Sequence, residues 1–94
     1  MLFKKSNVSV YKCKDFLLST LDKKPFRIDI DTKSVFAVKL KVQDRDIEVR
    51  VTKEGSSVIV SMTDPYGLIR VPVEKFKDFE KFKLFVASKI LSKL

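Results

Sequence analysis

The chain has 94 residues, with twenty Lys and Arg against twelve Asp and Glu, and a formal net charge of +8. This length predicts one domain, residues 1–94, with one hydrophobic core. Because 45% of the residues are hydrophobic and eight are Phe, we expect this core to be large enough for the domain to fold unaided. With no His and one Cys, the usual imidazole catalytic pairs, the usual zinc sites and an internal disulfide are excluded. We therefore predict a binding protein that is not an enzyme and has no catalytic residues, metal or cofactor.

The composition also bears on the compartment and the source. The sequence holds neither a long apolar run nor the apolar core of a secretory signal, so we expect a soluble, cytoplasmic protein with no membrane partner. The single Cys13 agrees with a reducing compartment. Charged residues make up 34% of the chain, and Asn and Gln occur once each, which is typical of thermophile proteins. We expect a thermophilic, archaeal source.

The first predicted element is a helix over residues 9–22. Residues 1–8 precede it and are interpreted as a flexible basic arm. Apolar residues recur every three or four positions and predict one buried stripe: Val10, Cys13, Leu17 and Leu21. Ser9 suits the N-cap, and Pro25 disfavours further helix.

From residue 26 the apolar period changes to two, which predicts half-buried strands near 26–31, 35–42, 46–51, 56–62 and 67–71. Turns at 43–46, 54–56 and 64–67 separate the later strands, and connections this short force antiparallel pairing. The side chains expected to face the core are Phe26, Ile28 and Ile30; Phe36, Val38, Leu40 and Val42; Ile47, Val49 and Val51; then either Val58, Val60 and Met62 or the adjacent Ile59; and Leu68 through Val71.

After Pro72 the apolar spacing becomes helical again, at Phe76, Phe79, Phe82, Val86 and Ile90, and Pro72 and Glu74 suit a helix start. We predict an α+β fold: an antiparallel sheet of four to five strands, with N- and C-terminal helices packed on one face. Phe residues occur every three positions, at 76, 79, 82 and 85, which is less than one helical turn, so they do not stay on one face of a helix. We therefore expect one spare ring, which is a ring that the core does not take up. Phe85 is thus either a partner-binding residue or packed by loops or by the first helix.

The sheet face that the helices leave open is the first candidate interface. Alternation places Arg27, Asp29 and Asp31 there, then Ala37, Lys39 and Lys41, then Glu48 and Arg50. Lys39, Lys41 and Arg50 form a basic cluster able to bind the phosphates of RNA or DNA. The scarcity of aromatic side chains on this face favours backbone or duplex contact over base stacking.

A second candidate interface lies in the arm and the first helix, with Lys4, Lys5, Lys12, Lys14, Lys23 and Lys24. The carboxylate pairs Asp29 with Asp31 and Asp44 with Asp46 are interpreted as solvated residues rather than as metal ligands.

Three segments together resemble a known type of RNA-binding protein: KDFLLSTL (14–21), VKLKVQDRDIEVRV (38–51) and VEKFKDFEKF (73–82). Their order looks like the α-β-β-β-α domains of signal recognition particle Alu-domain proteins and of a small archaeal/eukaryotic large-subunit ribosomal protein. The resemblance implies RNA contact through the open sheet face, at Lys39, Lys41 and Arg50. GLIRVPVEKF (67–76) before a final helix also looks like single-strand-binding transcription coactivators that dimerise through that helix.

The sequence thus predicts an RNA-binding component of a ribosome or ribonucleoprotein that contacts phosphates. Two alternatives stay open. One is a protein-interaction or homodimerisation module of viral or plasmid origin, which would use the Phe-rich C-terminal helix. The other is a single-stranded DNA-binding protein.

Overall fold

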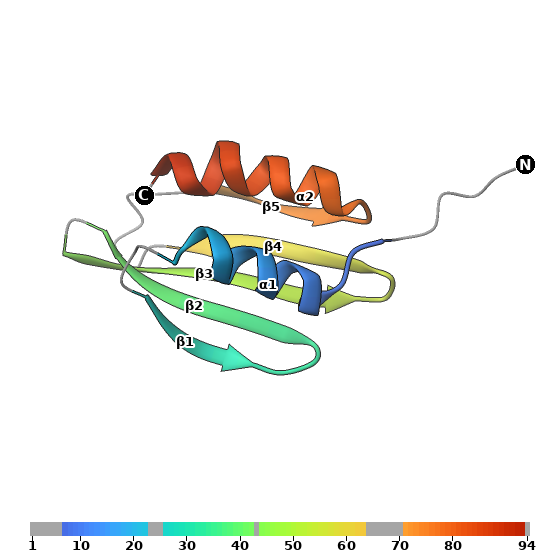
Figure 1. Ribbon diagram of the computed structural model, residues 1–94, viewed down its shortest axis with the longest axis horizontal. Helices are drawn as coiled ribbons and strands as arrows, with labels where there is room; N and C mark the ends of the chain where they lie inside the picture. The colour runs from blue at the N-terminus through green and yellow to red at the C-terminus, as the bar shows by residue number, and fades with distance from the viewer. Residues whose placement is uncertain (1–6, 23–25, 43, 64–70, 94) are drawn as a thin grey trace, which may run out of the picture.

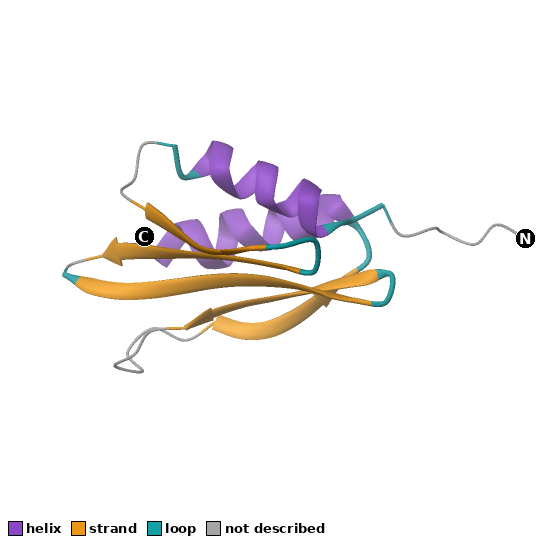
Figure 2. Cartoon of the chain, turned by 90° about the horizontal axis from the view of Figure 1, so that it is seen from below, coloured by secondary structure: helices purple, strands orange, loops and turns teal. Residues whose placement is uncertain are grey.

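The computed structural model describes residues 7–22, 26–42, 44–63 and 71–93, and shows a five-stranded antiparallel sheet in the order β1-β2-β3-β4-β5. Both helices pack on one face of this sheet (Figure 1, Figure 2), which confirms the predicted α+β architecture. The elements are α1 (Val10–Thr20), β1 (Phe26–Asp31), β2 (Val35–Val42), β3 (Arg45–Glu54), β4 (Ser57–Thr63), β5 (Val71–Phe76) and α2 (Phe79–Phe85), which continues as a π-helical segment (Val86–Ile90) and a 3₁₀ turn (Leu91–Lys93).

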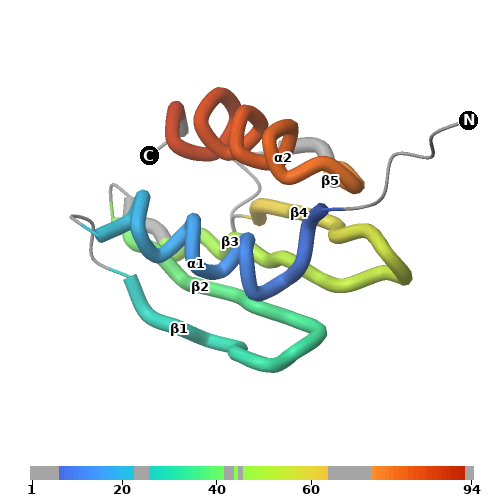
Figure 3. Tube along the Cα trace, turned by 45° about the vertical axis from the view of Figure 1, so that its right-hand side comes forward, coloured from blue at the N-terminus to red at the C-terminus, as the bar shows by residue number. Residues whose placement is uncertain are grey.

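Helix α1 begins where the sequence predicts. The Ser9 hydroxyl caps it by accepting a hydrogen bond from the Lys12 backbone N–H at 3.1 Å. The predicted stripe of Val10, Cys13, Leu17 and Leu21 is buried. Because α1 contacts β2 and β3 while α2 contacts β5, the two helices share the cover of one sheet face (Figure 3).

The core lies between this face and the helices. Paired residues of antiparallel strands point to the same side, and the pairs Val38↔Val49 and Val51↔Val60 fix which side is inward. Val58, Val60 and Met62 are buried, so β4 adopts the first of the two predicted registers. The central strands therefore follow the simple alternation of the sequence.

The C-terminal region differs from the prediction. Residues 71–76 form β5, which pairs with β4 through Val58↔Phe76, so the expected helix start at Pro72 and Glu74 is wrong. The helix begins at Phe79, because the Asp78 carboxylate accepts a hydrogen bond from the Glu80 N–H at 2.9 Å and caps it. For residues 71–76, pairing with the edge of β4 therefore decides the structure, although the spacing of their apolar residues also fits a helix. The predicted strand residues 68–70 and the turn at 64–67 lie outside the described residues.

This change explains why Phe85 is not a spare ring. Phe76 sits on β5 rather than on the helix, and its ring centroid is 5.2 Å from that of Phe85. Phe85 is 6% exposed and belongs to the core, whereas its neighbour Leu84 is 69% exposed. Phe85 is therefore a core residue, and the expectation that it is exposed for a partner is corrected.

Strand β1 also departs from simple alternation. Ile28 pairs with Val38, but Ile30 pairs with Ala37 and Asp31 with Phe36, so the register shifts between Ile28 and Ile30. A bulge of this kind sets two residues opposite one and reverses the facing of those that follow. Ile30 therefore lies on the open face and Asp31 on the helix-covered side, the reverse of the sequence-based expectation.

Cys13 offers a direct test of the core. It is fully buried, and burial raises the pKa of its thiol to about 12, because the thiolate is poorly solvated there. At about pH 8 we expect the native protein to react with a chromogenic disulfide about three orders of magnitude more slowly than the denatured chain, whose thiol pKa is about 8.5. Because the folded pKa is raised, this group stabilises the fold fully below about pH 8.5 and progressively less as pH rises towards 12. Equal rates for native and denatured protein would place Cys13 outside the core.

Candidate nucleic-acid interface

The open sheet face carries the predicted cations, but carboxylates are interleaved with them. Lys39 lies directly between Arg27 on β1 and Glu48 on β3, and Lys41 is directly opposite Asp46. Arg50 is opposite Ala37, and its Nε donates to Glu48 Oε1 at 2.8 Å. Opposite charges side by side cancel much of each other's field at a distance. Lys39, Lys41 and Arg50 therefore share a face as predicted without forming an uninterrupted basic surface.

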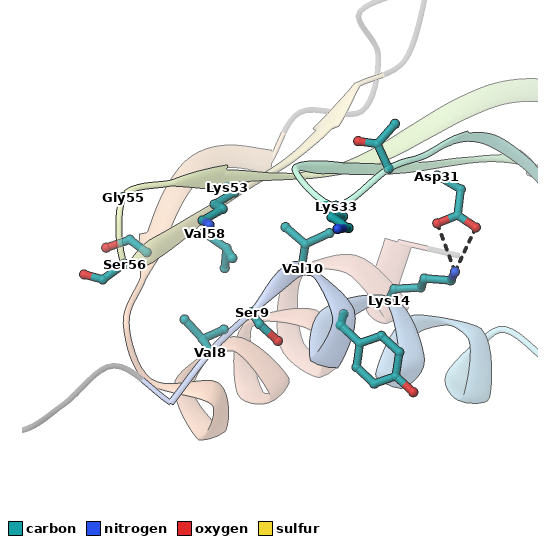
Figure 4. A pocket seen from close by; sticks show the side chains of 13 residues that line it. Val8, Ser9, Val10, Lys14, Asp31, Lys33, Lys53, Gly55, Ser56 and Val58 are labelled. Atoms are coloured by element: carbon teal, nitrogen blue, oxygen red, sulfur yellow. Dashed lines mark hydrogen bonds and ion pairs between the residues drawn. The ribbon is translucent and has the colours of Figure 1, made fainter.

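A second surface is concave and lies on the helix-covered side. The β3–β4 hairpin extends past the start of α1 (Figure 1), and the space between them is a groove of about 760 Å³ (Figure 4). We call it the basic groove. It is lined by residues 8–11 and Lys14 at and just before the start of α1, by residues 31–33 at the end of β1 and in the turn that follows, and by Lys53 and residues 55–58 of the β3–β4 hairpin.

Two exposed lysines of the groove, Lys33 and Lys53, come from segments that backbone hydrogen bonds join. Lys33 lies in the turn after β1, where Thr32 Oγ1 accepts from the Ser34 and Val35 N–H groups at 3.3 and 2.9 Å. The Lys53 N–H donates to the Ser34 carbonyl at 2.7 Å and so ties this turn to β3. Within the described ranges neither lysine makes an ion pair. Lys33 and Lys53 are thus free to bind an anion.

The other two charged residues of the groove lining, Lys14 and Asp31, form an ion pair. Lys14 Nζ contacts both carboxylate oxygens of Asp31, at 2.9 and 2.8 Å (Figure 4). This contact exists because the bulge in β1 turns Asp31 towards α1. Three lysines against one aspartate leave the lining with a net charge of +2.

The floor of the groove is apolar. Val10 and Val58 are buried, at 5% and 1% exposure, and Val8 is half-buried against the same core. The hairpin that closes one side reverses at Gly55, whose φ of +59° is the left-handed conformation that glycine adopts without strain. The groove therefore combines a hydrophobic floor with cationic sides.

The other predicted site residues lie elsewhere. Lys12 is exposed on α1, where its ammonium donates to the Asn7 carbonyl at 3.0 Å and lies 5.9 Å from the Phe79 ring centroid. Lys4, Lys5, Lys23 and Lys24 lie outside the described residues. Sequence reasoning missed Lys33 and Lys53, although one signal was present. The alternation of Ile47, Val49 and Val51 continues to Lys53, which places this lysine on the inward side of β3.

Comparison with known proteins gave no match: no family model, curated protein or solved structure was found to be similar to this chain. The resemblance to Alu-domain and ribosomal proteins stays a prediction. Among the helices that the structure describes, none has the length and apolar character needed to cross a membrane.

Proposed function

We propose that this domain binds nucleic acid, with RNA as the first candidate, by holding backbone phosphates against the lysines of the basic groove. The observation that supports this most directly is that Lys33 and Lys53 line the same groove as two cations without ion-pair partners in the described structure. Lysines bind phosphates by displacing condensed counterions, and a chain of net charge +8 attracts a polyanion from a distance.

The charge pattern favours the groove over the open face. A phosphate that approaches Lys39 or Lys41 also approaches the carboxylate of Glu48 or Asp46 on the neighbouring strand. In the groove the carboxylate of the lining, Asp31, is paired with Lys14 at 2.8 Å, and Lys53 lies directly opposite Val58 rather than an acidic residue. Electrostatic repulsion of a phosphate is therefore smaller in the groove, and we assign the primary contact to it.

RNA rather than DNA is proposed because of the α-β-β-β-α resemblance, and the cellular role proposed with it is that of a component of a ribosome or ribonucleoprotein in the cytoplasm. Phosphate contacts position a protein on a strand but read no sequence. We therefore propose binding with little sequence preference.

The test is a set of binding isotherms for single-stranded RNA, duplex RNA and duplex DNA between about 50 and 300 mM salt. Two phosphate contacts predict that log affinity falls linearly with log salt, with a slope steeper than about −1.4 for single strands and −1.8 for duplexes. The ratio of absorbance at 260 to 280 nm, before and after a high-salt wash, shows whether nucleic acid accompanies the purified protein. Failure to bind any of the three at the lowest salt, or binding independent of salt, would refute the proposal.

A further inference from the structure

The basic groove also contains an aromatic side chain that packing does not require. Tyr11 lines the groove from the first turn of α1 and is 76% exposed, more than Ile28, Val73 or Leu84, the other exposed large hydrophobic residues of the described chain. Its neighbours Val10 and Cys13 carry the buried stripe of the helix, so the core does not account for an aromatic ring at this position.

The groove suits a ligand that is both anionic and partly apolar. Its volume of about 760 Å³ is within the roughly 300–1,000 Å³ of sites that hold small organic ligands, which leaves room for a nucleotide. Cations at Lys33 and Lys53 match phosphates, while the exposed ring of Tyr11 matches the face of a base. A duplex cannot offer a base face to this ring, because its bases are stacked on each other and only their edges, the sugars and the phosphates are accessible.

Resting on the proposed function, we propose that an unpaired nucleotide binds at the basic groove, with its base stacked on Tyr11 and its adjoining phosphates at Lys33 and Lys53. The domain then prefers single-stranded segments, such as loops or ends, to continuous duplex. The sequence alone favoured backbone or duplex contact over base stacking, because it placed almost no aromatic side chain on the open sheet face. The groove supplies a ring on the other side of the molecule.

Tyrosine fluorescence provides the experiment, because the chain has no Trp and two Tyr. Replacing Tyr66 by Phe leaves Tyr11 as the one tyrosine reporter in the full chain. The probes are an oligoadenylate RNA of about 12 nucleotides and a duplex RNA of the same length. We expect the single strand to quench Tyr11 and to bind more tightly than the duplex. Tyr11→Ala is expected to weaken single-strand binding about 5- to 100-fold with little effect on duplex binding, and Tyr11→Phe, which keeps the ring, to restore it.

The outcomes separate this inference from the proposed function. Equal, salt-dependent binding of both RNAs without quenching, and unaffected by Tyr11→Ala, would overturn the unpaired-nucleotide site and leave phosphate binding intact. Binding of neither RNA would overturn both. Because Tyr11 is largely exposed, Tyr11→Ala is expected to leave the thermal midpoint near that of the parent, so lost binding would not reflect unfolding.

Discussion

The double substitution Lys33→Ala with Lys53→Ala is expected to reduce the slope of log affinity against log salt by about 1.4 for single-stranded RNA. Each lost phosphate contact removes about 0.7 of that slope, so the two lost contacts together correspond to about a 25-fold loss of affinity at about 0.1 M salt relative to about 1 M. Both side chains are exposed, so we expect the free energy of unfolding to change by no more than about 0.5 kcal/mol for each substitution. Anisotropy titrations of labelled RNA measure the slope, and denaturant unfolding checks the stability.

Lys39→Ala with Lys41→Ala is the matched control. It lowers the net charge by the same amount, but on the open face, where each lysine lies directly opposite an acidic residue. We expect a smaller change of slope, because these ammonium groups are already partly neutralised. If the open-face variant loses the salt dependence and the groove variant keeps it, the interface is the sheet, as the sequence first indicated.

Asp31→Asn changes the charge of the groove in the opposite direction. It removes the carboxylate that Lys14 contacts at 2.8 Å, so one more lysine is free to meet phosphate, and RNA affinity is expected to rise. The side chains of Lys14 and Asp31 are 29% and 43% exposed, and a pair this accessible contributes no more than about 1 kcal/mol to stability. A decrease in affinity for a folded Asp31→Asn variant would contradict the location of the binding site.

The sequence predicted the parts of the fold that depend on local periodicity. The predictions were correct for the buried stripe of α1, for its Ser9 cap and for the alternation of β2, β3 and β4. In these elements the local apolar pattern and the packing of the core require the same residues to point inwards. Residues 73–82 were harder. Their Phe spacing fits a helix, whereas β4 offers residues 71–76 an edge on which to pair, and only the long-range pairing decides where β5 ends and α2 begins.

The site was less predictable than the fold. The bulge between Ile28 and Ile30 has no signal in the regular alternation of FRIDID, yet it turns Asp31 to the side of the sheet on which Lys14 lies. Lys33 and Lys53 are twenty residues apart and line the same groove because β2 pairs with β3 and the Lys53 N–H donates to the Ser34 carbonyl. Counting charges along the chain therefore located the basic excess without revealing which cations come together.

Phe85→Glu is expected to lower the free energy of unfolding by at least about 4 kcal/mol, or to prevent folding. Truncating a buried Phe costs about 3–5 kcal/mol, and an unpaired carboxylate in an apolar site adds to that loss. Phe85 is 6% exposed and packs against Phe76 with their ring centroids 5.2 Å apart. Because small domains are stable by about 5–15 kcal/mol, a loss of this size is readily seen in denaturant unfolding followed by circular dichroism.

Leu84→Glu is the matched control, one position earlier on α2 and 69% exposed. Its stability is expected to stay within about 0.5 kcal/mol of the parent, because the new carboxylate remains in water. Sedimentation of the same variant tests homodimerisation through the C-terminal helix. A parent that sediments as a dimer and a Leu84→Glu variant that sediments as a monomer would assign this helix a partner after all, at Leu84 rather than at Phe85. If instead Phe85→Glu folds with parental stability, the ring does not belong to the core, and the partner-binding interpretation of Phe85 applies again.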